Sequence, residues 1–187
     1  MNWEVECQKI SRGIRERVLE HTINHGGYLS QACSSAEIFS ILYNKSMKLG
    51  PSEGLFSTHK FEGTPSVNNP HPQKGFLYNG AKNPDLDRFF LSPSHYALTL
   101  YAALIETKRL NDKSLKEFNK DGSVLDMIGS EHSPGHETNG GSFGQTISQA
   151  AGVAWARRRK KEKGLVWLFL SDGEFQDCLL YTSDAAD

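Results

Sequence analysis

Residues 165–170, Leu-Val-Trp-Leu-Phe-Leu, are apolar at every position, and Ser-Asp-Gly follows them directly. A strand that is apolar on both faces is typical of a parallel sheet covered by helices. Residues 146–163 come before this strand, and their first half is rich in small apolar residues, which predicts a closely packed helix. This order predicts an α/β fold with an open, mainly parallel sheet and helices on both faces, in which ligands bind beyond the carboxyl ends of the strands.

Two helices are predicted in the first fifty residues. Apolar side chains recur every three or four positions from Trp3 to Val18, which predicts an amphipathic helix ending near Asn24. The sequence Ser34-Ser-Ala-Glu37 has the spacing of a capping box and predicts the start of a second helix, which continues through Met47.

The middle of the chain begins with an irregular excursion, residues 52–87, that is rich in glycine and proline. A loop of this length in a compact domain needs a function or a partner. Residues 87–91 predict a short buried strand, and Ser92-Pro93 predicts the cap of a helix that reaches about Leu110. A second capping box, residues 114–117, predicts a short helix, and Gly164 is expected to cap the helix 146–163.

The composition excludes several classes of protein. The 21 Lys and Arg nearly balance the 22 Asp and Glu, so the net charge of −1 gives no electrostatic reason to bind nucleic acid or acidic lipid. No apolar run approaches the roughly 20 residues of a membrane helix, and no signal peptide is visible, so a cytoplasmic protein is expected. The three cysteines fit neither a disulfide framework nor a zinc site, and Cys33 is expected to be a buried thiol.

Several polar residues could carry chemistry at the predicted carboxyl edge. Asp172 could ligate a hard cation while Gly173 lets a phosphate approach the backbone, but an Asp-Gly pair is also a common turn. Two glycine-containing loops, residues 24–33 and 133–145, could bind phosphate through backbone N–H groups or could simply turn the chain. Four histidines lie in or beside these loops and could contact phosphate or substrate oxygens or serve structural roles: His25, His95, His132 and His136.

Five motifs occur along the chain in a fixed order. They are Arg12-Gly-Ile-Arg through Asn24-His25-Gly-Gly, residues 35–43, Asp87-Arg-Phe-Phe-Leu-Ser-Pro-Ser-His95, Ser133-Pro-Gly-His136 with Gly141-Ser-Phe-Gly-Gln145, and Leu168-Phe-Leu-Ser-Asp-Gly173. In this order they resemble the thiamine-diphosphate domain of transketolases and their close relatives, from about residue 11 to residue 177.

The resemblance implies thiamine diphosphate as the cofactor, with Mg²⁺ or Ca²⁺ holding its diphosphate. Asp172 would ligate the cation, and the backbone of Gly173 would lie against the phosphate. His95 would reach the diphosphate. The loop that lies along the cofactor would contribute Gly141, Ser142 and Phe143.

The resemblance also implies an activity, the transfer of a two-carbon ketol unit from a ketose phosphate to an aldose. His25 and His136 would bind substrate oxygens near the reacting carbon. A related synthase that joins pyruvate to glyceraldehyde phosphate shares the domain plan and stays open as an alternative. A non-catalytic binding or assembly module with the same fold is the alternative from another class.

Residues 178–187 resemble the translation of a transposon-end adapter used in sequencing libraries. We therefore expect residues 1–177 to be a partial thiamine-diphosphate-binding domain and the last ten residues to be a non-native tail. The family pattern would continue with an Asn that completes the metal site. In the family, the carboxylate that activates the cofactor belongs to a second domain, usually from the partner subunit of a homodimer, so the chain by itself is expected to show no turnover.

Overall fold

The computed structural model describes residues 2–58, 60–61, 63 and 74–178. Its α-helices and β-strands are α1 (Trp3–His25), α2 (Leu29–Ile41), β1 (Arg88–Leu91), α3 (Ala97–Glu106), α4 (Gln145–Arg159) and β2 (Val166–Phe169). A π-helical segment continues α2, and short 3₁₀ helices join the longer elements. These segments are Leu42–Ser46 (π) and Gly75–Asn79, Ser94–Tyr96, Asp112–Glu117 and Asp172–Gln176 (3₁₀).

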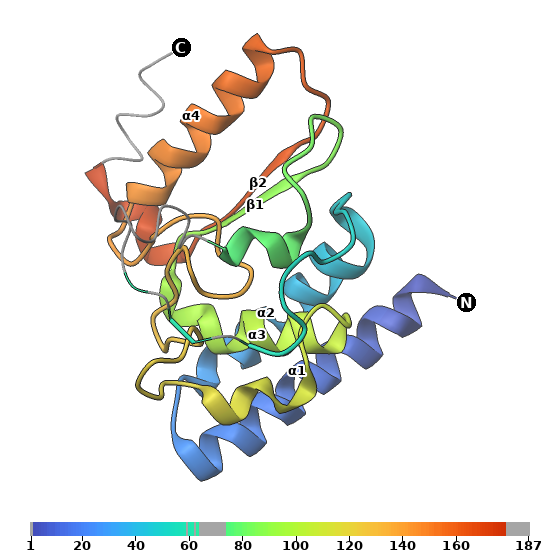
Figure 1. Ribbon diagram of the computed structural model, residues 1–187, viewed down its shortest axis with the longest axis vertical. Coiled ribbons are helices and arrows are strands. Elements are labelled where there is room, and N and C mark those ends of the chain that lie inside the picture. Colours follow the sequence, from blue (N-terminus) through green and yellow to red (C-terminus); the bar gives the residue numbers. More distant parts are fainter. Residues whose placement is uncertain (1, 59, 62, 64–73, 179–187) are drawn as a thin grey trace.

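The two strands lie between α4 on one side and the helices α1, α2 and α3 on the other (Figure 1). β1 and β2 pair in parallel, with Arg88 opposite Val166 and Leu91 opposite Phe169. On one face α2 packs against the strands, and the ring of Phe39 stacks on Phe169 with the ring centroids 5.0 Å apart. On the other face α4 contacts both strands. The prediction of parallel strands with helices on both sides is therefore confirmed.

The sheet of the described residues is narrower than the open sheet that the sequence predicts. It contains one strand pair, and all four residues of β2 are partly exposed. Leu165, which begins the apolar run, is 59% exposed. β1 pairs with one edge of β2, and no described strand pairs with the other edge, so the burial expected of a central strand is not reached here.

Helix α3 forms the centre of the core. All residues from Ala97 to Ile105 are buried, and they contact α1 and α2. A helix with no polar face has to be covered on all sides, so the other helices and the loops pack around α3. In the described part of the chain, no helix is both long enough and apolar enough to cross a membrane.

The predicted start of the second helix is wrong. α2 begins at Leu29, five residues earlier, after a connection of only three residues. The hydroxyl of Ser34 donates to the carbonyl of Ser30 at 3.2 Å, as a serine inside a helix can. Glu37 pairs with Arg15 of α1 instead of capping the helix.

Three other predicted caps are also replaced. Ser92 binds Glu174, and α3 begins only at Ala97. The short helix Asp112–Glu117 is capped by Asn111, whose side chain accepts from the N–H of Lys113 at 2.9 Å. α4 ends at Arg159. Lys161, two residues later, takes the left-handed conformation with φ 58°, in place of the predicted cap Gly164.

Parts of two predicted segments lie outside the described residues: 59, 62 and 64–73 within the excursion 52–87, and 179–187 in the tail. The described end of the excursion is packed against the loop 131–136, because the N–H of Gly75 donates to Glu131 at 2.9 Å and the carbonyl of Gly75 accepts from Gly135 at 2.9 Å. Cys33 is exposed, which corrects its predicted burial, whereas Cys7 is buried.

The Asp87 carboxylate joins the starts of both strands to the segment after α2. One oxygen, Oδ2, accepts from the N–H of Lys48 at 2.9 Å and from the indole Nε1–H of Trp167 at 2.9 Å. The other, Oδ1, accepts from the N–H of Leu165 at 2.8 Å. Burial alone would raise the pKa of Asp87, but these three donors and the charge of Arg157 lower it below its ordinary value.

Asp87→Ala is expected to lower the free energy of unfolding by about 3 kcal/mol, because three donors lose their acceptor in the interior. Because the folded pKa is depressed, the contribution of Asp87 is complete above its ordinary pKa of 3.8 and is lost as the pH falls through the folded pKa. Urea unfolding at pH 7 and pH 3 measures both effects. The exposed Asp85→Ala is the matched control, and an equal loss in both variants would contradict the role of Asp87.

Candidate functional site

Three segments that are distant in the sequence meet at Ser92, directly after the carboxyl end of β1. The N–H of Ser92 donates to the carbonyl of Phe169 at 3.0 Å, and its own carbonyl accepts from Gly141 at 3.3 Å. Its hydroxyl donates to the carboxylate of Glu174. The glycine loop 139–144 and the turn after β2 are therefore fixed at one sheet edge, the carboxyl edge.

Glu174 is fully buried and holds the turn after β2 in place. Its Oε2 accepts from the N–H of Ser171 at 2.9 Å and from the Ser171 hydroxyl at 3.1 Å. The side chain of Ser171 in return caps the backbone of Glu174, which completes a capping box around Asp172 and Gly173. Sequence reasoning missed Glu174, although the spacing Ser171-x-x-Glu174 is the signal that could have found it.

His95 is half-buried at the carboxyl edge. Its ring lies between two tyrosine rings, with centroids 5.9 Å from Tyr28 and 5.0 Å from Tyr96. Burial lowers the pKa of His95, and the charge of Glu174 partly opposes this shift. A neutral imidazole, which has one donor and one acceptor nitrogen, is therefore favoured at neutral pH.

The glycine loop lies close to the residues before His95. A Cβ atom on Gly140 would be 2.4 Å from the Ser94 hydroxyl and 2.7 Å from the Ser92 carbonyl, so only glycine fits there. The Ser94 hydroxyl is buried and has no hydrogen-bond partner in the described part of the chain. Gly141 has a φ of 100°, which favours glycine. Gly141, Ser142 and Phe143 are exposed at the surface of the loop.

Asp172 and Gly173 lie exposed at the start of the turn after β2. No atom of the described residues is within 4 Å of a Cβ built on Gly173, so a ligand can approach its backbone. The described residues contain no group of three His, Cys, Asp or Glu side chains that could hold a metal ion. Asp172 is thus a single candidate ligand, and further cation ligands have to come from the cofactor, water or other parts of the protein.

His136 lies in the interior, beside Gly129, whose N–H donates to the carbonyl of Ser94 at 3.2 Å. His136 is 1% exposed, and a Cβ on Gly129 would be 2.0 Å from its Nε2. Its Nδ1 is 3.3 Å from the carbonyl of Pro134. Burial lowers the pKa of His136 to about 4, so the imidazole is neutral at physiological pH. The loop that carries His136 was predicted correctly as a loop, and the His136 side chain is enclosed in it.

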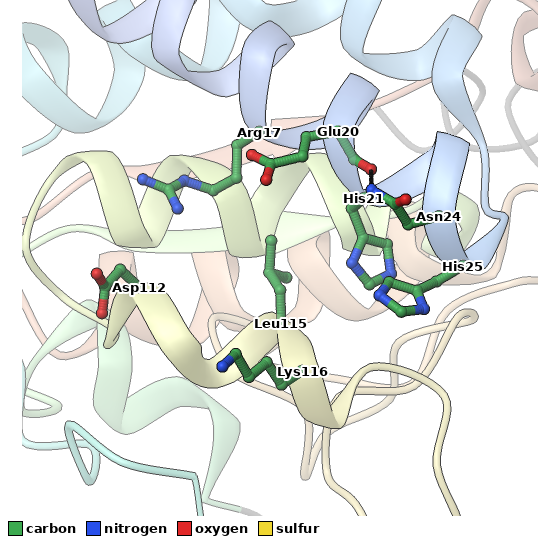
Figure 2. Close-up of a pocket in the computed structure, with 8 residues that line it drawn as sticks. All are labelled: Arg17, Glu20, His21, Asn24, His25, Asp112, Leu115 and Lys116. Atoms are coloured by element: carbon green, nitrogen blue, oxygen red, sulfur yellow. Dashed lines mark hydrogen bonds between the residues drawn. The ribbon is translucent and has the colours of Figure 1, made fainter.

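His25 contacts another histidine of its own helix. It is the last residue of α1, is exposed, and contacts the ring of His21 (Figure 2). Tyr28, three residues later, reaches His95 instead. His132, the fourth candidate histidine, is held by Asp126, whose Oδ2 lies 2.6 Å from its Nε2. Of the four predicted histidines, the structure places His95 among the residues that Ser92 brings together.

The fold and this edge define an α/β protein whose candidate ligand-binding residues follow parallel strands. Residues 74–165 match the family model of the transketolase thiamine diphosphate binding domain. The family resemblance indicated by the motifs is thus confirmed, because the chain is similar to the thiamine diphosphate binding domain of transketolases over this range.

Three curated relatives show how far the similarity extends. An uncharacterised transketolase family protein of Sinorhizobium fredii (strain NBRC 101917 / NGR234) is 30% identical over 167 residues, which cover 86% of this chain and 50% of that protein. Transketolase-like protein 2 of Homo sapiens is 27% identical over 177 residues, covering 91% of this chain and 24% of that protein. Transketolase of Homo sapiens is 26% identical over 152 residues, covering 81% of this chain and 20% of that protein. The chain thus spans half or less of the length of these relatives.

Glu174→Gln is expected to lower the pKa of His95 further, because it removes the negative charge that opposes the effect of burial. Titration of the imidazole C–H signals by NMR measures this change. Glu20→Gln, an exposed position on α1, is the matched control and should leave the His95 signals unchanged. An unchanged His95 pKa in Glu174→Gln would show that this carboxylate does not act on the imidazole.

The stability of the chain should fall as the pH is lowered from about 6.5 to about 4. In this range His136 takes up a proton in the unfolded chain but stays neutral in the folded chain, where its pKa is about 4. The contribution of His136 to stability is therefore complete above pH 6.5, and up to about 3 kcal/mol of it is lost as the pH falls. His136→Leu should flatten this slope in urea unfolding, while the exposed His25→Gln should keep it. An equally steep slope in His136→Leu would contradict the assignment.

Proposed function

We propose that this chain supplies the diphosphate-binding edge of an enzyme that uses thiamine diphosphate to transfer two-carbon ketol units between sugar phosphates. The observation that carries the proposal is the junction at Ser92, which joins the His95 segment, the glycine loop and the Asp172-Gly173 turn at one edge. These are the three motifs that the family resemblance relates to the cofactor. Their meeting at the carboxyl ends of parallel strands is the position where α/β proteins bind ligands.

The residues present fit the diphosphate end of the cofactor. The buried Ser94 hydroxyl lacks a partner among the described residues, His95 is half-buried beside it, and the backbone of Gly173 is open to approach. His95 would donate to a diphosphate oxygen, and the backbone of residues 141–143 would face the cofactor. Asp172 would ligate the Mg²⁺ or Ca²⁺ that holds the diphosphate, as a hard cation prefers oxygen ligands. When bound, thiamine diphosphate supplies a carbanion and stores the electron pair after C–C cleavage.

The substrate-binding role proposed for His25 agrees with its exposure at the end of α1. An imidazole there would donate to or accept from sugar hydroxyls. The same role for His136 requires the surrounding loop to open, because its side chain is enclosed. The substrates themselves would be sugar phosphates.

The remaining parts of the active site would come from elsewhere in the protein or from a second subunit. The relatives are at least about twice as long as the matched region, so the chain corresponds to a fraction of each. We propose that a second domain, in a homodimer, contributes the carboxylate that activates the cofactor. The synthase that joins pyruvate to glyceraldehyde phosphate is the alternative reaction, and a non-catalytic assembly module is the alternative role.

Isothermal titration of the chain with thiamine diphosphate and Mg²⁺ tests the binding step. Asp172→Asn and His95→Ala are expected to weaken binding by about tenfold or more, since the loss of even an indirect metal-site partner has effects of this size. Asp121→Asn, an exposed carboxylate in another loop, is the matched control.

Two outcomes would contradict the proposal. Binding that is equally strong in the Asp172, His95 and Asp121 variants would show that the cofactor, if held, is held elsewhere. A chain that binds no thiamine diphosphate, tested also in its full-length protein, would favour the assembly module.

A further inference from the structure

A pair of histidines near the end of α1 lies outside the diphosphate-binding edge, and one of them, His25, is the residue with the proposed substrate role. His21 and His25 are four residues apart, so they lie one turn apart on the same face of the helix. Their ring centroids are 5.0 Å apart, and the ring planes are inclined at 44°. Figure 2 shows the two imidazoles side by side at one end of a pocket.

The ring of His21 packs against Phe118, which fixes its position. The edge of its ring meets the ring of Phe118, with the centroids 4.9 Å apart and the planes at 83°. The side chain is only 8% exposed, and its Nε2 is buried without a hydrogen-bond partner among the residues that the structure describes. A buried polar nitrogen that lacks a partner is costly, and a ligand that accepts its lone pair or its proton would remove this cost.

The pocket beside the pair is large enough for a hydrated ion. Its volume is about 230 Å³, and α1 and the segment Asp112–Glu117 form its walls. The charged side chains of the lining balance, with Arg17 and Lys116 against Glu20 and Asp112, so the pocket as a whole does not repel a cation. Arg17 is in addition neutralised by Glu106, at 2.7 Å.

We propose that His21 and His25 form a two-imidazole site for a divalent transition-metal ion of the Zn²⁺, Ni²⁺ and Cu²⁺ class. Two histidines at positions i and i+4 of a helix chelate such ions in known metal motifs, and imidazole is a ligand that they prefer. The described residues offer no third His, Cys, Asp or Glu for this ion, so water completes its coordination. The site differs from the cation site at Asp172, because Mg²⁺ and Ca²⁺ prefer oxygen ligands.

The proposal does not rest on the proposed function, because both ligands belong to α1 and neither is part of the diphosphate edge. Titration of the chain with Ni²⁺, after alkylation of exposed thiols such as Cys33 and Cys178, measures the affinity. His25→Ala is the main variant, since this side chain is exposed and its loss leaves the core intact. Asn24→Ala, which changes the same pocket without removing an imidazole, is the matched control.

We expect the chain to bind one Ni²⁺ at this site, His25→Ala to bind it at least about tenfold more weakly, and Asn24→Ala to bind it unchanged. An excess of Mg²⁺ should not displace the ion. With Cu²⁺, the electron paramagnetic resonance spectrum should show coupling to two imidazole nitrogens in the parent chain and to one in His25→Ala.

Equal affinity in the parent chain and His25→Ala would overturn the proposal. So would loss of binding in His132→Ala alone, because it would place the ion at the Asp126–His132 pair. His21→Gln provides a second variant if its fold is retained by circular dichroism, and unchanged affinity and unchanged nitrogen coupling in it would likewise overturn the site.

Discussion

The carboxylate of Asp87 fixes the register of the strand pair, and the position of the candidate site depends on that register. It accepts from Leu165 and Trp167 at the start of β2 and from Lys48 after α2. A shift of one residue would turn every side chain of a strand to the opposite face. With the starts of both strands fixed, their ends at Leu91 and Phe169 are level, and the next residue, Ser92, can accept from the glycine loop and donate to Glu174.

A buried guanidinium fixes the same region from the side of α4. Arg157 donates to three backbone carbonyls of the loop before β1, including Leu86 at 2.8 Å, and pairs with Glu162. A buried charge of this kind stabilises only when its donors are paired. Asp87 and Arg157 therefore hold the strands between α4 and the other α-helices through polar contacts, while α3 supplies the apolar core.

Much of the fold could be predicted from the sequence, because it depends on apolar periodicity and on the order of the elements. The pattern from Trp3 to Val18 gave the first helix, and residues 87–91 and 165–170 gave both strands. The helix caps could not be predicted, because a capping box is a local pattern that tertiary contacts override. Glu37 pairs with Arg15 of another helix, and Ser92 pairs with Glu174. Both partners are distant in the sequence.

The candidate site could be predicted only in part, for a related reason. A residue that directly follows a strand is placed by the strand, so the positions of His95 and Asp172 at the carboxyl edge followed from the sequence order. His136 lies within an irregular loop, where the backbone path decides whether a side chain points inward, and no pattern in the sequence reveals this path. Its burial beside Gly129 became visible only in three dimensions.

The short connection between α1 and α2 separates the two groups of imidazoles. Gly26 and Gly27 have φ values of 79° and 126°, which favour glycine, and a Cβ on Gly27 would be 2.9 Å from the side chain of Leu98. The chain can therefore turn sharply against α3, leaving His25 beside His21 and bringing Tyr28 to His95. A longer loop, as the sequence predicts for residues 24–33, would let the histidine at its start reach the carboxyl edge. The short connection therefore places Tyr28, and not His25, against the ring of His95, while His25 stays beside His21 on α1.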